Sequence, residues 1–140
     1  MEELKKFFNA VDVALIHIDH ESQRFIYVNE YFIKLMGYDE ETLLNKNFTD
    51  FIHPEDKERT LDFVKEGILG NIDNRYVNRF VNGTSGEVLT LLWFTNNASF
   101  DGTGKYCTAF CLNMNIVLSE LKKEVDKKNV YKTLLSILHD

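Results

Sequence analysis

Short runs of β-branched and aromatic residues alternate with polar turns along much of this chain. The runs over residues 13–19 and 24–28 are separated by His20-Glu21-Ser22-Gln23, an arrangement that predicts an antiparallel hairpin. Three further runs, over residues 75–81, 87–100 and 105–116, are separated by the turn sequences NGTSG and DGTG. They predict three further antiparallel strands.

The period changes to a helical one between these two groups of strands. Asn29 is placed to cap a short helix that ends at Gly37, the residue type that most often ends a helix in the left-handed conformation. Asp39 is placed to cap the next helix, with Glu40 and Glu41 in its first turn, where negative charge complements the helix dipole. These three adjacent acids therefore indicate a helix start and not a catalytic carboxylate pair.

Three more helices follow from the apolar spacing. Pro54 suits the first position of a longer helix whose buried stripe is Leu61, Val64 and Ile68. Residues 2–10 carry a similar stripe that includes Phe7 and Phe8, and they predict an N-terminal helix. A charged segment from Leu118 onward predicts a C-terminal helix.

Composition narrows the function classes. The chain has 140 residues, enough for one domain with appendages, and 44% hydrophobic residues, which is typical of a globular protein. Its formal net charge of −6 argues against nucleic acid as a partner. No apolar run approaches the roughly 20 residues that a bilayer requires, and the N-terminus lacks a secretory signal. We therefore expect a cytoplasmic protein without a membrane segment.

The order of elements and several short motifs resemble the PAS sensory domain. The motifs are VNEYFIKLMGYDEETLL at residues 28–44, FIHPED at 51–56, the turn at 82–87 and Asp101-Gly102. The resemblance covers residues 8–117. It implies an α+β fold, with a five-stranded antiparallel sheet of order 2-1-5-4-3 and helices on one face. We expect a capping helix over residues 1–11, a PAS domain over 12–117 and a signalling helix over 118–140.

The sequence departs from the PAS pattern where the last strand ends. The family usually has Asp-x-Thr there, and its side chains tie the exit helix to the sheet. The matching residues here are Asn115-Ile116-Val117. Asn115 can still form hydrogen bonds, but Val117 has no hydroxyl, so this tie is in doubt.

The resemblance also implies a ligand pocket between the helices and the sheet. Alternation puts Cys107, Ala109, Cys111 and Asn113 on one face of the last strand, and their small side chains leave room. The competing interpretation is that phenylalanines fill this space. The candidate ligand-binding residues are Phe94, Asn96, Cys111, Asn113, Phe48 and Phe63.

The opposite face of the last strand is apolar where water would otherwise lie. Phe110, Leu112 and Met114 form this stripe, and something must cover it. The N-terminal residues Phe7 and Phe8 have suitable chemistry. A second copy of the chain could share the task, because PAS domains often form dimers through this surface, and we expect a homodimer.

No pattern indicates a metal site or catalysis. His17, His20, His53 and His139 lack the local spacing of zinc ligands. His53 is the one candidate haem ligand, in a context shared with members that carry no haem. Members that form a covalent flavin adduct have a Gly-x-Asn-Cys-Arg-Phe motif; Leu44-Asn45-Lys46-Asn47-Phe48 stands here, without a cysteine, which excludes that chemistry. We leave the identity of any cofactor open.

Two hypotheses remain. The first is a non-catalytic sensory module that binds a small ligand or partner and signals to a C-terminal effector. The ending LLSILHD resembles segments that lead into diguanylate cyclases or histidine kinases, so we expect such an output domain to follow. The alternative is a ligand-free scaffold with a filled core that forms dimers.

Overall fold

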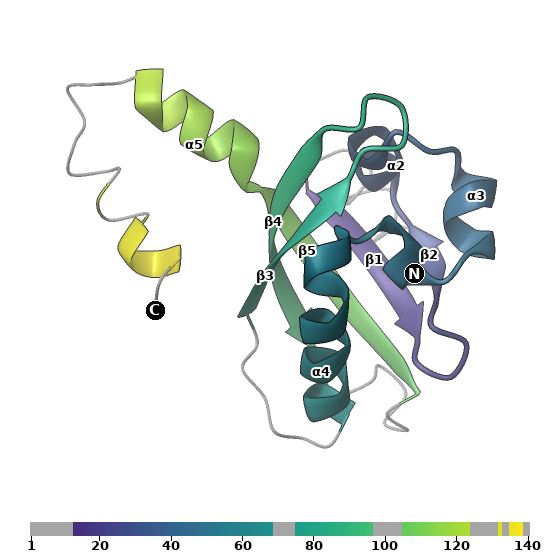
Figure 1. The fold of residues 1–140 in the computed structure, drawn as a ribbon. Coiled ribbons are helices and arrows are strands. Elements are labelled where there is room, and N and C mark those ends of the chain that lie inside the picture. The colour runs from purple at the N-terminus through teal and green to yellow at the C-terminus, as the bar shows by residue number, and fades with distance from the viewer. Residues whose placement is uncertain (1–12, 69–74, 97–104, 124–131, 133–134, 139–140) are drawn as a thin grey trace, which may run out of the picture.

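The computed structural model describes residues 13–68, 75–96, 105–123, 132 and 135–138. Five strands form one antiparallel sheet of order β2-β1-β5-β4-β3, which confirms the predicted topology. The strands are β1 (Ala14–Asp19), β2 (Arg24–Val28), β3 (Arg75–Val81), β4 (Val88–Asn96) and β5 (Tyr106–Asn113). The helices α2 (Glu30–Met36), α3 (Glu40–Asn45) and α4 (Lys57–Ile68) lie on one side of the sheet (Figure 1).

The predicted helix caps are present. The Asn29 side chain accepts a hydrogen bond from Phe32 N, and Gly37 ends α2 with φ 70°. The Asp39 side chain accepts from Thr42 N at the start of α3. Two short 3-10 turns, η1 (Phe48–Phe51) and η2 (Pro54–Asp56), lead into α4. The sequence predicted Pro54 at the first position of the longer helix, but Pro54 begins η2 and α4 starts three residues later, at Lys57.

Phenylalanine dominates the core between the helices and the sheet. Phe25 and Phe32 pack edge to face with 5.3 Å between ring centroids, and Phe25 stacks on Phe51 at 6.1 Å. Inward positions of the sheet complete this core, among them Ile16, Leu91 and Cys111. The helical layer therefore rests on closely packed aromatic rings.

The exit helix begins earlier than the sequence pattern predicted. The last strand ends at Asn113, and α5 (Met114–Lys123) starts at once, whereas the pattern predicted a strand to residue 116 and a helix from Leu118. In Figure 1, α5 leads away from the sheet at the end of β5. The predicted N-terminal helix lies outside the described residues. None of the described helices is long and apolar enough to span a membrane.

Candidate functional site

A cavity of about 60 Å³ lies between α4 and the inner face of the sheet. Most of its described lining is apolar or aromatic: Ile16, Ile18, Phe25, Phe48, Ile52, Phe63, Val64, Phe80, Trp93, Cys107 and Ala109. The polar lining residues are His20, Thr60, Tyr76, Asn78 and Thr95. None of these described lining residues is an aspartate, glutamate, lysine or arginine.

Small side chains in β5 leave the cavity open. Cys107 and Ala109 alternate inward, and Ala109 lies between Ile16 of β1 and Thr95 of β4 in the sheet register. The aromatic core fills the rest of the space beneath the helices. The predicted pocket and the predicted phenylalanine filling are therefore both present, in adjoining regions.

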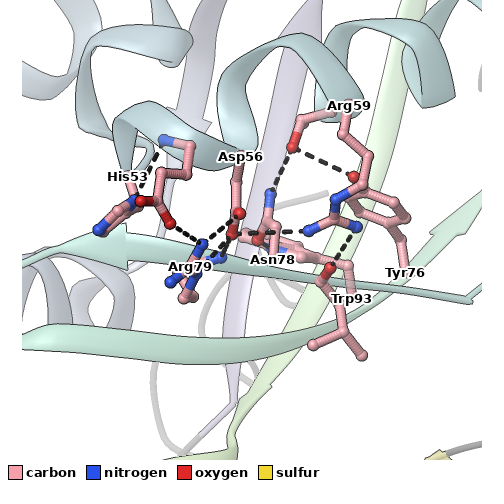
Figure 2. A network of polar contacts seen from close by, with 10 residues as sticks. His53, Asp56, Arg59, Tyr76, Asn78, Arg79 and Trp93 are labelled. Carbon is pink, nitrogen blue, oxygen red and sulfur yellow. Dashed lines mark hydrogen bonds and ion pairs between the residues drawn. The ribbon is translucent and has the colours of Figure 1, made fainter.

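A chain of hydrogen bonds forms the polar wall of the cavity. Trp93 Nε1–H donates to Asn78 Oδ1 at 2.8 Å, and Asn78 Nδ2 donates to Thr60 Oγ1 at 3.3 Å. The hydroxyls of Thr60 and Tyr76 are 3.4 Å apart. Figure 2 labels Tyr76, Asn78 and Trp93 of this chain, beside Asp56, Arg59 and Arg79. Because Asn78 is buried and uses both ends of its amide, it fixes the Trp93 indole against the sheet.

An ion pair beside this wall fastens the start of α4 to β3. Asp56 Oδ1 accepts from Arg79 Nη2 at 2.8 Å, and Asp56 Oδ2 accepts from Arg79 Nε at 3.0 Å and from Arg79 N at 2.8 Å. These hydrogen bonds from Arg79 lower the pKa of Asp56 to about 2. Arg59 lies 3.5 Å from Asp56 and stands over the Tyr76 ring. The charged side chains next to the cavity are therefore paired with one another and do not line it.

His20 differs from the other polar lining residues. Its Nδ1 is buried and has no hydrogen-bond partner among the described residues. Burial lowers the pKa of His20, opposed in part by Asp19, so the imidazole is neutral at pH 7. Burial also raises the pKa of Cys107 to about 11 and that of Cys111 further. Both thiols are protonated at neutral pH and are poor nucleophiles.

Asn115 connects the exit helix to the sheet. Its Oδ1 accepts from Thr90 N at 3.1 Å, and its Nδ2 donates to Val88 O at 2.9 Å. Two residues earlier, Asn113 Oδ1 accepts from Asn115 N at 3.0 Å. The tie that the sequence left in doubt is therefore supplied by an amide, which holds the start of α5 against β4.

Comparison with known proteins identifies the fold family. A profile of the PAS family, described as PAS fold, matches residues 2–104. The chain belongs to the PAS family. Similar solved structures include a PAS domain from Colwellia psychrerythraea, with 15% identity, TM-score 0.66, and coverage of 80% of this chain and 94% of that chain. No match was found among curated protein sequences.

Other similar solved structures include a domain of a diguanylate cyclase and a LOV protein. The N-terminal domain of a Marinobacter aquaeolei diguanylate cyclase with a PAS/PAC sensor is 18% identical, with TM-score 0.61, over 74% of this chain and 96% of that chain. A Rhodobacter sphaeroides LOV protein is 17% identical, with TM-score 0.65, over 80% of this chain. The chain spans about two thirds of the length of that LOV protein, 65%, and 66% of a single-residue variant of RsLOV. At these identities the likeness shows the fold.

The PAS cavity contains only part of the predicted ligand-binding set. Phe48 and Phe63 line it. Cys111 is fully buried in the core beside it, and Asn113 is used at the start of α5. Phe94 was placed wrongly, because it faces the other side of the sheet and stacks on Phe110 with 4.9 Å between centroids. The side chain of Asn96 is not among those that the structure describes.

Sequence reasoning missed the polar wall. Tyr76, Asn78 and Phe80 alternate on one face of β3, so a polar residue between two aromatic ones was a usable signal for the cavity lining. Thr60 is a similar signal on α4, since it is a polar residue one turn before Val64. His20 was assigned to a turn, and nothing in its local sequence indicates that its ring lines a cavity.

The outer face of this PAS sheet carries an apolar patch in the described part of β4 and β5. The Phe94–Phe110 stack lies there, and Phe110 is 38% exposed. Leu112 is half-buried. Met114 was also predicted on this surface, but it is buried in the first turn of α5, because the chain turns into a helix after Asn113. Phe7 and Phe8 lie outside the described residues.

Proposed function

We propose that this PAS domain is a sensory module that binds a small molecule in the cavity and biases the geometry of α5. The observation that supports this most strongly is that one strand serves both sites. Cys107 and Ala109 of β5 line the cavity, and Asn113 at the end of the same strand begins α5. A shift of β5 therefore reaches the exit helix without an intermediate element.

Strand β4 provides a second connection. Trp93 lines the cavity, and Thr90 on the same strand donates its N–H to Asn115 of α5. A ligand biases the helix if it binds two arrangements of these strands with different affinity. The same strands line the cavity and hold Asn115, so a change in their arrangement would alter both the cavity and the hydrogen bonds of Asn115.

The effector is proposed from the relatives. Some similar structures belong to a two-component sensor histidine kinase and a diguanylate cyclase, and we propose an output domain of either kind after α5. We also propose that the module is cytoplasmic. In this arrangement α5 is the connecting element, and catalysis belongs to the effector.

The larger cofactors of related domains do not fit this cavity. LOV domains are among the similar structures, but about 60 Å³ is far below the roughly 300 Å³ or more of ordinary ligand pockets. No described lining residue carries a positive charge to pair with a phosphate. The haem candidate His53 uses Nδ1 to accept from Glu55 N and does not line the cavity. We therefore favour a small ligand.

Filling the cavity tests the proposal. Trp93 is the single tryptophan of the chain and lines the cavity, so its emission reports occupancy. We expect at least one neutral molecule of up to about six non-hydrogen atoms to change the emission saturably. Ala109→Val places two more carbons in the cavity and should weaken that binding about tenfold or more.

The matched control for this test is Thr108→Val, the neighbouring position on the opposite face of β5. It should leave the affinity unchanged. If no molecule in a screen of neutral and charged compounds binds saturably, or if Ala109→Val binds as tightly as the parent, the sensory proposal is wrong.

A ligand-free scaffold is the second candidate, supported by the exposed aromatic stack on the outer face. Phe110→Glu puts a charge on this stack and should weaken any homodimer about tenfold or more, which sedimentation velocity can measure. The control is Ile26→Glu, a similarly exposed apolar position on β2. If the parent chain is dimeric and Phe110→Glu sediments identically, this face does not form the dimer.

A further inference from the structure

The electrostatics of the cavity point to an uncharged ligand. No described lining residue has a formal charge at pH 7. The charged cluster beside the polar wall, Asp56 with Arg59 and Arg79, is already paired and does not line the cavity. An ionic group moved from water into this site would lose its hydration without gaining a counter-charge, and that loss exceeds what a few apolar contacts return.

The hydrogen-bond pattern points to one polar group on the ligand. The wall of Trp93, Asn78 and Thr60 is satisfied internally, as described above. His20 Nδ1 is different, because it is buried without a partner among the described residues. A buried polar atom without a hydrogen-bond partner destabilises the folded protein. A ligand that completes this hydrogen bond therefore has a site prepared for it.

The size of the cavity limits the ligand further. An engineered apolar cavity of about 150 Å³ accommodates benzene, and this cavity is about 60 Å³. A molecule of about three to five non-hydrogen atoms is consistent with that volume after small side-chain shifts. The remaining lining is aliphatic or aromatic, so the rest of the molecule is hydrocarbon-like.

We propose that the cavity selects small, neutral, mostly apolar molecules with one hydroxyl-type group, which hydrogen-bonds to His20 Nδ1. A hydroxyl suits this position because it donates and accepts, and a neutral imidazole nitrogen does one or the other depending on its tautomer. This inference rests on the proposed function, since it names the ligand class of the same cavity.

Three probes with a common branched frame test the inference: isobutanol, isopentane and isobutylammonium. Each has five non-hydrogen atoms, and they differ in one terminal group. Binding is followed by the methyl resonances of Ile16, Ile18, Val64 and Ala109, which line the cavity. We expect saturable shifts with isobutanol and none with isobutylammonium.

The decisive variant is His20→Phe, which keeps a planar ring and removes both nitrogens. It should weaken the binding of isobutanol about fivefold, which corresponds to the loss of one net hydrogen bond, and leave the affinity for isopentane unchanged within about twofold. His20→Leu gives the same comparison if the Phe variant does not fold. The control is His17→Phe, which removes an imidazole from the opposite face of β1, where His17 contacts Tyr27; it should change neither affinity.

The outcomes separate this inference from the proposed function. Equal binding of the cation and the alcohol, or equal effects of His20→Phe on alcohol and alkane, would overturn the ligand class while the cavity remains a binding site. The same holds if all three probes fail and other molecules in the Trp93 screen succeed. If no molecule binds in either experiment, the cavity holds water only and both proposals fall.

Discussion

Asp56→Asn is expected to lower the free energy of unfolding at pH 7 by about 2–4 kcal/mol. The Asp56 side chain is 6% exposed and accepts three hydrogen bonds from Arg79, one of them from the backbone. Breaking a buried pair costs about 3–5 kcal/mol, and the 37% exposure of Arg79 reduces this through solvent screening. An asparagine also points an NH2 group at guanidinium donors. Urea unfolding followed by Trp93 emission measures the loss.

The pH dependence gives this prediction a second readout. The pKa of Asp56 is lowered to about 2 when folded, against about 3.9 when unfolded. The contribution of the Asp56 carboxylate to the free energy of unfolding is therefore complete above about pH 4 and disappears as the pH falls from about 4 to 2. Asp56→Asn should lack this part of the acid transition. Glu55→Gln is the control, because Glu55 is 74% exposed and makes one contact with Arg79 at 3.2 Å; equal losses from both variants would contradict the assignment.

Asn29→Ala is expected to have a similar effect for a different reason. Asn29 is buried, and its Oδ1 accepts from Leu15 N at 3.1 Å and from Phe32 N at 3.0 Å. Its Nδ2 donates to Val13 O at 2.7 Å. Alanine removes the cap of α2 and leaves a buried N–H of β1 without a partner, so we expect a loss of about 2–4 kcal/mol. For a chain of this size that lowers the melting temperature by roughly 10 °C.

Two comparisons test whether the hydrogen bonds between Asn29 and β1 stabilise the fold beyond capping α2. Asp39→Ala removes a cap of the same kind from α3, where the side chain accepts from Thr42 N at an exposed site. Its loss of stability should be smaller. Asn29→Ala should also accelerate amide hydrogen exchange at Leu15, which Asp39→Ala should not. Similar losses and unchanged exchange at Leu15 would mean that Asn29 acts as a cap alone.

Local signals in the sequence predicted most of the fold because each acts within a few residues. Asn29 and Asp39 cap helices through N–H groups three positions later, and Gly37 adopts the left-handed conformation that glycine tolerates best. The strand order came from the resemblance to PAS domains, and the structure confirms it. No short-range pattern contains that order.

The errors lie where the local signals are ambiguous. Leu91, Leu92, Trp93 and Phe94 are all apolar, so alternation alone does not reveal which of them face inward. The register with β5 decides it, since Trp93 pairs with Cys111 and Phe94 with Phe110. Likewise, the end of β5 depends on Asn115 bonding to β4, a contact between residues 25 positions apart.

Candidate site residues were the hardest to predict, because a cavity depends on what neighbouring elements fail to fill. Phe48 and Phe63 were identified as large residues near the expected pocket, and both line it. His20 directly follows the last residue of β1, Asp19, and lies two positions after the inward-facing Ile18, so its imidazole falls on the cavity side of the sheet. A single sequence gives no measure of such spacing between elements.

The central claim is that occupancy of the cavity changes the exit helix. Amide hydrogen exchange across α5 and at Thr90, with and without the tightest-binding molecule from the Trp93 screen, tests it most directly. We predict altered exchange in the parent chain and in Thr108→Val, and none in Ala109→Val, whose cavity is filled. Saturable binding at Trp93 with unchanged exchange throughout α5 would show that the ligand is bound but not relayed, and would contradict the claim.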